Sequence, residues 1–329
     1  MKVFCLKFLT LFILIFMVVG YYGWRIHPEL SGGLGQLGKI PFGKSYNNLY
    51  SGRADTLATF HYTECLSADS ISAYPIVNIG DSFSICGEYG YLNYFGALSP
   101  VCVGNIIRRK FSDPIDDYIA LLNNGCFRPG QIVILESGER LFLWRLYIAN
   151  LHDRRMPAFP EPEAKSKKSK PDMLQETLQW IRLSFGHDNP VYHYKLSEDC
   201  FDPEQYARDL YVYEEDLKFM DDNVKRVALE KLDSLKILSE ARGVHFYFMI
   251  CTDKYDAYEP LILDSHAINP ELDDLPDETY IINPKPQIRA AIGQGVKNVY
   301  KVNDTHTTDI GSEIFAQCLW DGVRSHFQE

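Results

Sequence analysis

A short polar turn follows one of the most apolar runs of the chain. Residues 74–79 read YPIVNI and lead directly into Gly80-Asp81-Ser82. Glycine allows a sharp turn after a strand, and the sequence SFSICGEYGYLNYF can begin a helix at or just after Ser82. A serine held at such a turn can act as a nucleophile when a base reaches its hydroxyl, and its backbone N–H can stabilise the developing oxyanion. Ser82 is therefore a candidate nucleophile.

Among the nine histidines, His306 has the surroundings expected of a base for this serine. It lies in KVNDTHTTDIGSEIFAQCLW, where a predicted strand at 297–302 gives way to a loop and then to a helix capped near Thr308 or Asp309. Asp304 precedes His306 by two residues, close enough to orient the imidazole and stabilise its charged form. His245, by contrast, lies inside an apolar run and is interpreted as a core histidine. Together with the serine, Asp304 and His306 form a predicted Ser-His-Asp triad.

The elements that must position this triad follow from the alternation of apolar runs with amphipathic segments. Strands are predicted at 74–79, 131–135, 244–251, 279–283 and 297–302, and helices at 113–125, 214–242 and 286–295. Near-continuous apolar strands alternating with helices favour an α/β fold with a mainly parallel sheet covered on both faces. The carboxyl ends of parallel strands meet at one edge, so Ser82 and His306 are expected to lie close together.

Composition limits the classes of function. The chain has 329 residues, of which 46% are hydrophobic and 23% charged, so most of it should be globular. A formal net charge of −11 argues against nucleic acid as a partner, because phosphate binding needs clustered lysine and arginine. There are eight cysteines but no CxxC spacing, so zinc ligation has no support. Nothing in the pattern indicates a metal or another cofactor.

The N-terminal segment predicts export from the cytoplasm. Lys2 and Lys7 precede residues 8–24, which carry no charge and end in aromatic residues. This length is near the lower limit for a membrane-spanning helix, and the positive-inside rule then places the rest of the chain outside the cytoplasm. A cleaved signal peptide is the alternative, with Val18 and Gly20 as small residues before the cut.

The predicted domain organisation has three parts. Residues 1–24 are a signal anchor or signal peptide, residues 25–50 a glycine-rich spacer, and residues 51–329 the globular domain. Proline and lysine are concentrated at 157–173, which is interpreted as a mobile insertion in that domain. A basic patch that contacts an acidic polymer or lipid headgroups is the other interpretation of its lysines.

Four sequence blocks resemble the SGNH hydrolases, and in particular the branch that includes alginate O-acetyltransferases and related polysaccharide acetylation proteins. IGDSFS (79–84) is similar to that branch's G-[DT]-S-[FY]-S turn, and IVILESGERLF (132–142) to its V-x-W-E-x-x-E-R block. FMICTDKYDAY (248–258) is similar to P-x-K-x-x-x-Y, and NDTHTTDIGSEIFA (303–316) to D-T-H-W-T-x-x-G. The resemblance implies a three-layer α/β/α, flavodoxin-like fold and a catalytic domain over 51–329.

Further site residues are implied by the same resemblance. Residues expected to support the triad are Asp81, Glu136, Glu139, Arg140, Lys254 and Tyr258. An ordinary ion-pair cluster at a strand end is the alternative for the two glutamates and the arginine, and a loop anchor is the alternative for the lysine and tyrosine. Candidate oxyanion donors are the Ser82 N–H, Gly96 and Asn105.

Three departures from the family pattern bear on the substrate. Thr307 replaces the tryptophan that usually follows the histidine, and Leu135 replaces the tryptophan before the first glutamate. The Asp-x-His block comes last in the chain, as in ordinary SGNH esterases, whereas it precedes the serine in the alginate enzymes. These departures weaken the transfer of substrate identity.

The resemblance implies an exported O-acetyltransferase that acts on an exopolysaccharide or cell-wall glycan through an acetyl-serine intermediate. Such an enzyme needs a polysaccharide acceptor and a multi-spanning membrane acyltransferase that supplies the acetyl group. Two alternatives stay open: a carbohydrate O-acetyl esterase with the same triad, and a non-catalytic glycan-binding assembly protein.

Overall fold

The computed structural model describes residues 2–25, 59–65, 67–85, 89–106, 113–157, 159, 191–202, 204–264, 266, 275, 278–302 and 304–328. The spacer predicted at 25–50, except for residue 25, and nearly all of the insertion predicted at 157–173 lie outside these residues.

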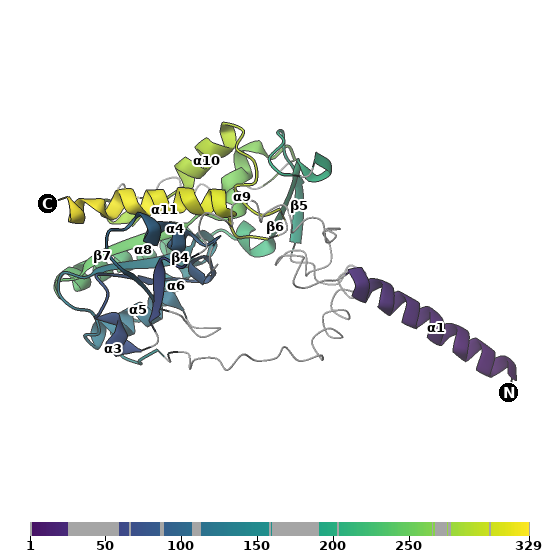
Figure 1. Ribbon diagram of the computed structural model, residues 1–329, viewed down its shortest axis with the longest axis horizontal. Coiled ribbons are helices and arrows are strands. Elements are labelled where there is room, and N and C mark those ends of the chain that lie inside the picture. Colours follow the sequence, from purple (N-terminus) through teal and green to yellow (C-terminus); the bar gives the residue numbers. More distant parts are fainter. Residues whose placement is uncertain are drawn as a thin grey trace.

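A six-stranded sheet with parallel pairing throughout forms the centre of the protein (Figure 1). Its strands are β1 (Tyr62–Cys65), β2 (Ile76–Ile79), β3 (Val103–Ile106), β4 (Ile132–Gly138), β7 (His245–Cys251) and β8 (Ile281–Ile282). Their spatial order is β1-β3-β2-β4-β7-β8. Without the edge strand β1, this is the doubly wound order 2-1-3-4-5, whose direction reverses between β2 and β4. The predicted α/β fold with a mainly parallel sheet is confirmed.

Helices cover both faces of the sheet, with α10 and α11 on one side and α3 and α5 on the other in Figure 1. The helices of the body are α3 (Ala68–Ile71), α4 (Tyr91–Leu98), α5 (Pro114–Asn123), α6 (Glu139–Ile148), α8 (Asp222–Glu240), α9 (Lys254–Tyr258), α10 (Lys285–Gly293) and α11 (Asp309–Val323). Successive residues of β4 point to opposite faces, so Ile134 packs into the core beneath α11 and Leu135 into the core beneath α8. Burying one such side chain contributes about 1.5–3 kcal/mol.

Capping residues set the starts of two predicted helices. The Asp113 side chain accepts a hydrogen bond from Ile115 N at 2.8 Å and starts α5. At α11, Thr308 Oγ1 accepts from Ile310 N at 3.2 Å. Such a cap satisfies a backbone N–H that has no partner inside the helix. The predicted helix at 113–125 and the predicted start near Thr308 are both confirmed.

Two predicted elements differ in the structure. Residues 297–302 form no strand; Tyr300 instead makes an isolated bridge with Thr307, so the chain folds back on itself around the Asp-x-His loop. The helix predicted at 214–242 begins only at α8, because Asp221 caps it there through a hydrogen bond from Val224 N. Before it come β5 (Val191–Lys195), β6 (Asp209–Tyr213) and the 3-10 turn η6 (Glu214–Leu217), which together form a hairpin and a turn.

The histidine at 245 also differs from its prediction. It is the first residue of the strand β7 and is exposed, not buried in the core. Its ring contacts that of His326 with centroids 4.4 Å apart. The apolar pattern located the strand but not the solvent-exposed end of it.

The N-terminal segment is helical over α1 (Lys2–Arg25). Side chains described at 4 and 7–18 are all exposed, so this helix does not pack into either core. Across the described part of the chain, no helix has the combination of length and apolar character needed to cross a bilayer. The predicted membrane-spanning helix is therefore unsupported.

Candidate active site

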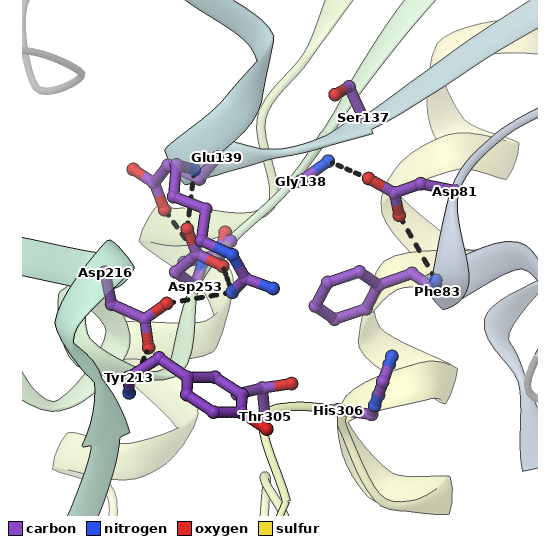
Figure 2. Close-up of polar contacts among 12 residues, drawn as sticks. Asp81, Phe83, Ser137, Gly138, Glu139, Tyr213, Asp216, Asp253, Thr305 and His306 are labelled. Carbon is purple, nitrogen blue, oxygen red and sulfur yellow. Dashed lines mark hydrogen bonds and ion pairs between the residues drawn. The ribbon is translucent and has the colours of Figure 1, made fainter. Parts of the chain in front are cut away.

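Charged and polar side chains follow three adjacent strands at the carboxyl edge of the sheet (Figure 2). Residues 80–82 follow β2, residues 139–140 follow β4, and residues 253–254 follow β7 two positions after its end. This edge contains the point between β2 and β4 where the strand order reverses, and ligands of doubly wound proteins bind at such points. The topology therefore places the predicted site residues where a ligand site is expected.

Ser82 begins η3 (Ser82–Ile85), a single 3-10 turn and not the longer helix that was predicted. Asp81 holds this turn, because Phe83 N donates to its Oδ1 at 3.3 Å and Ser84 Oγ donates to its carbonyl at 2.9 Å. Ser82 itself is half-buried. A single turn supplies little helix dipole, so the chemistry of the serine must depend on the side chains around it.

The carboxylate of Asp81 ties the serine turn to the neighbouring strand. Asp81 Oδ2 accepts hydrogen bonds from Gly138 N at 2.8 Å and Arg145 Nη1 at 2.9 Å, and Asp81 N donates to Glu136 Oε2 at 2.9 Å. Burial raises the pKa of Asp81. Three opposing interactions outweigh it and hold the pKa at about 2: a hydrogen bond with Glu136, the positive charge of Arg145 and a hydrogen bond from the Gly138 amide. Asp81 and Glu136 therefore position the turn.

Gly80 leaves room for that carboxylate. A Cβ at Gly80 would lie 2.1 Å from Glu136 Oε2 and 2.8 Å from Ser84 Oγ. We expect Gly80→Ala to displace Glu136 and to lower the free energy of unfolding by about 1–3 kcal/mol, as overpacking does. Urea unfolding measures this. Gly293→Ala at the end of α10 is the control, since its Cβ meets nothing within 4 Å; equal losses in both variants would contradict the expectation.

The Asp304–His306 pair has the geometry of an oriented base. Asp304 Oδ1 lies 2.8 Å from His306 Nδ1 and accepts from the backbone N–H groups of Thr305 and His306 at 2.7 and 3.3 Å. The carboxylate therefore places the imidazole proton on Nδ1 and the lone pair on Nε2. Nε2 is buried and has no hydrogen-bond partner within the described part of the chain.

Phe83 places this base beside the serine turn. Its ring packs on the imidazole of His306 with centroids 5.0 Å apart, and it follows Ser82 directly in the chain. Figure 2 shows the two rings near one another. Because His306 Nε2 has no hydrogen-bond partner among the described residues, which include Ser82, the serine–histidine hydrogen bond of a triad is not formed in this structure. Such bonds often tighten only when substrate binds. A buried Nε2 without a partner costs about 1–3 kcal/mol, which a hydroxyl donor at this position would relieve.

Lys254 anchors the loop that carries Asp304 and His306, called the base loop below. Its side chain is fully buried, and Nζ donates to Val302 O at 2.8 Å and to Asp304 O at 3.4 Å. The ammonium also lies 5.3 Å from the ring centre of Phe201. Burial lowers the pKa of Lys254 to about 7, although the charges of Asp304 and Asp216 act in the opposite direction. These contacts favour the loop-anchor interpretation over direct catalysis.

Tyr258 supports the same loop by packing. Its ring is fully buried and lies between Phe201, with centroids 5.0 Å apart, and Tyr300, with centroids 6.0 Å apart. Tyr300 in turn donates from its hydroxyl to Thr252 O at 2.6 Å. The structure thus brings the Lys254 and Tyr258 block together with the Asp-x-His block, as the resemblance implied.

Five residues beside the base loop form a buried ion cluster: Glu139, Arg140, Asp216, Asp253 and Lys285. Arg140 Nη1 pairs with Asp216 Oδ1 at 2.9 Å and with Asp253 Oδ1 at 2.7 Å. Glu139 pairs with Lys285 at 2.7 Å and accepts from Asp253 N at 3.0 Å. The ion-pair interpretation of Glu139 and Arg140 is therefore the one that their contacts support.

The two further oxyanion candidates have other roles in the structure. Gly96 lies inside α4, where a Cβ would be 2.3 Å from His61 O, and an N–H this far into a helix bonds within it. Asn105 is buried on β3, accepts from Asn78 Nδ2 at 3.1 Å and donates to Ser84 O at 3.4 Å. Asn105 therefore stabilises the serine turn through its hydrogen bond to Ser84 O. The Ser82 N–H stays a prediction.

Some residues at the site were not found from sequence. Asp253 follows a predicted strand almost directly, so its position at the carboxyl edge was a usable signal. Arg145 lies in α6, which was not predicted. Tyr213 lies in the hairpin, for which the sequence predicted no element, and Asp216 lies in a turn where the sequence predicted a helix; only the tertiary fold brings them here.

Comparison with known proteins identifies no relative. No protein-family model, no curated protein and no solved structure matches this chain.

Proposed function

We propose that this protein is an exported, serine-dependent O-acetyltransferase of the SGNH type that acts on an exopolysaccharide or cell-wall glycan. The observation that carries the proposal is His306, whose Nδ1 is held by Asp304 at 2.8 Å, while its buried Nε2 beside the serine turn has no partner among the residues that the structure describes. A neutral imidazole in this tautomer is a general base. The doubly wound strand order and the position at its reversal point also support the proposal.

In the proposed reaction, Ser82 Oγ attacks the carbonyl carbon of an acetyl ester while His306 Nε2 takes the hydroxyl proton. The tetrahedral intermediate then expels the donor alcohol, which receives that proton from the imidazolium, and acetyl-Ser82 remains. A sugar hydroxyl repeats the attack on acetyl-Ser82 with His306 as base, and the acetylated sugar leaves as the serine recovers its proton. Asp304 stabilises the imidazolium in both halves and stays ionised.

The proposed location and partner follow from the N-terminal sequence and from the resemblance. Lys2 and Lys7 before the uncharged residues 8–24 support export, with residues 1–24 as signal anchor or signal peptide. An enzyme outside the cytoplasm has no pool of activated acetyl donors, so a multi-spanning membrane acyltransferase is the proposed source of the acetyl group.

A carbohydrate O-acetyl esterase is the second candidate, and one observation favours it. Thr307, at the position of the family tryptophan, is 6% exposed and its hydroxyl lies 2.9 Å from Ser312 Oγ, so it offers a sugar no surface. Water would then replace the sugar hydroxyl in the second half of the same reaction.

Incubating the full chain with 4-nitrophenyl acetate and a mixture of acidic and neutral oligosaccharides tests the proposal. Mass spectrometry should find one acetyl group on the peptide that contains Ser82, and acetylated sugar in solution. The variant Ser82→Ala should lose both products, and Ser234→Ala on the exposed side of α8 should keep both. Free acetate without acetylated sugar would assign the esterase, and identical results from Ser82→Ala and wild type would reject serine catalysis.

A further inference from the structure

The β5–β6 hairpin carries a row of ring and charged side chains that the proposed chemistry does not use. His193 lies opposite Tyr211 in the antiparallel register, and Lys195 lies opposite Asp209. Directly opposite residues share a face of the sheet, and every second residue along a strand returns to that face. These four side chains therefore lie on one face together with Tyr213.

One end of this row reaches the candidate active site. Tyr213 N donates to Asp216 Oδ2 at 3.2 Å, and its ring points toward the base loop in Figure 2. Burial raises the pKa of Tyr213 to about 12, and the nearby carboxylate of Asp304 adds to the shift. With a rise of about 3.4 Å per residue, the row extends about 14 Å from Tyr213 to the other end of the hairpin.

The exposed members of the row are held in fixed positions by a buried carboxylate. Asp209 Oδ1 lies 2.6 Å from His193 Nε2 and 2.5 Å from Lys195 Nζ, and its side chain is only 8% exposed. The imidazole also stacks on Tyr211 with centroids 4.6 Å apart and an angle of 12° between the planes. His193 and Lys195 nevertheless remain 43% and 56% exposed. A rigid, exposed ring with polar neighbours loses little conformational freedom when it binds a ligand.

This face has no excess of positive charge. Lys195 pairs with Asp209 through its side chain, and its backbone N–H donates to Asp264 Oδ2 at 3.2 Å. A face without excess positive charge has no strong field to attract a polyanion. A flat ring beside fixed donors and acceptors suits an uncharged sugar, whose C–H face packs on the ring while its hydroxyls bond to the polar groups.

We infer that the hairpin face formed by His193, Lys195, Asp209, Tyr211 and Tyr213 binds a neutral glycan chain and leads it to His306. This inference rests on the proposed function, because it names the acceptor of that reaction. Its test is a binding experiment without chemistry, so the two ideas can fail separately.

The test uses the full chain with Ser82→Ala and measures binding of four linear hexasaccharides by calorimetry: cellohexaose, mannohexaose, xylohexaose and hexagalacturonate. We expect saturable binding of at least one neutral hexasaccharide. Adding His193→Ala should weaken that binding about tenfold, the size of one aromatic contact. Tyr192→Ala is the matched control, because Tyr192 is the adjacent residue, is exposed like His193 and points to the opposite face.

Three results would overturn the inference: no binding of any neutral hexasaccharide, tighter binding of hexagalacturonate, or equal affinities in the His193→Ala and Tyr192→Ala variants. Thermal melting of both variants confirms that each is folded. Failure of the proposed function has a different signature, namely the absence of acetyl-Ser82 in the wild-type protein.

Discussion

Replacing Asp304 with asparagine should slow acetyl transfer about ten-thousandfold and leave the protein folded. Asp304 Oδ1 accepts from His306 Nδ1 and from two backbone N–H groups. An asparagine oxygen can keep the backbone hydrogen bonds, but the amide no longer enforces the Nδ1–H tautomer and leaves the imidazolium without its countercharge. The effect belongs to the chemical step, so kcat for 4-nitrophenyl acetate should fall far more than KM changes.

Asp321→Asn is the control for this prediction. Asp321 lies on α11, is 46% exposed and pairs with Arg324 at 3.2 Å, far from the base loop in the chain. It should keep the wild-type kcat, and circular dichroism should be the same for both variants. If Asp304→Asn kept more than about a tenth of the wild-type kcat, the imidazole would not depend on this carboxylate and the proposed base would be wrong.

Local signals explain which parts of the fold were predictable. The strands β4 and β7 contain continuous apolar runs, at 132–135 and 246–251, and such runs are typical of strands buried on both faces. The cap residues Asp113 and Thr308 fix helix starts through bonds to atoms two residues away. Each of these signals acts within a few residues, so the sequence alone was sufficient.

Contacts between distant residues explain what was not predictable. Residues 214–221 continue the helical spacing of α8, but Asp216 pairs with Arg140, which lies 76 positions earlier in the chain. This pair, and the hydrogen bond from Tyr213 N to Asp216, hold the segment as a turn. The loss of the strand expected at 297–302 has a nearer cause, because Tyr300 bridges to Thr307 across the Asp-x-His loop.

The candidate site was predictable in residue types but not in contacts. The motif placed Lys254 and Glu136 near the triad, yet their roles depend on which atoms they meet. Lys254 Nζ meets two backbone carbonyls of the base loop, and Glu136 meets the backbone N–H of Asp81. Neither motif spacing nor composition encodes such contacts, because each joins segments about 50 or more residues apart.

Replacing Arg140 with methionine should lower the free energy of unfolding by about 3–5 kcal/mol near neutral pH, as expected when one partner of a buried ion pair is removed. Arg140 is the shared partner of Asp216 and Asp253, whose side chains are 0% and 1% exposed. Methionine has a similar length and fills part of the space, so the loss is mainly electrostatic. Urea unfolding of the full chain measures it.

The size of this loss should depend on pH. Burial raises the pKa of Asp253 well above its ordinary value even beside Arg140, and burial also raises the pKa of Asp216. Between the unfolded and folded pKa values the folded state binds more protons, so stability falls as pH rises through that window. Without Arg140 both pKa values rise further. The difference in the free energy of unfolding between wild type and Arg140→Met, measured at about pH 5 and at about pH 8, should therefore be larger at the higher pH.

Two further variants separate the ion cluster from general effects of losing an arginine. Arg155→Met removes a cation that is 86% exposed and pairs with Asp153, and its unfolding midpoint should match wild type at both pH values. Adding Asp253→Asn to Arg140→Met removes one of the two carboxylates that lose their arginine partner. This double variant should recover part of the lost stability at the higher pH. If the loss in Arg140→Met were the same at both pH values, the carboxylates would be ionised and solvated without Arg140. The buried ion cluster would then not stabilise the base loop electrostatically, contrary to what its contacts indicate.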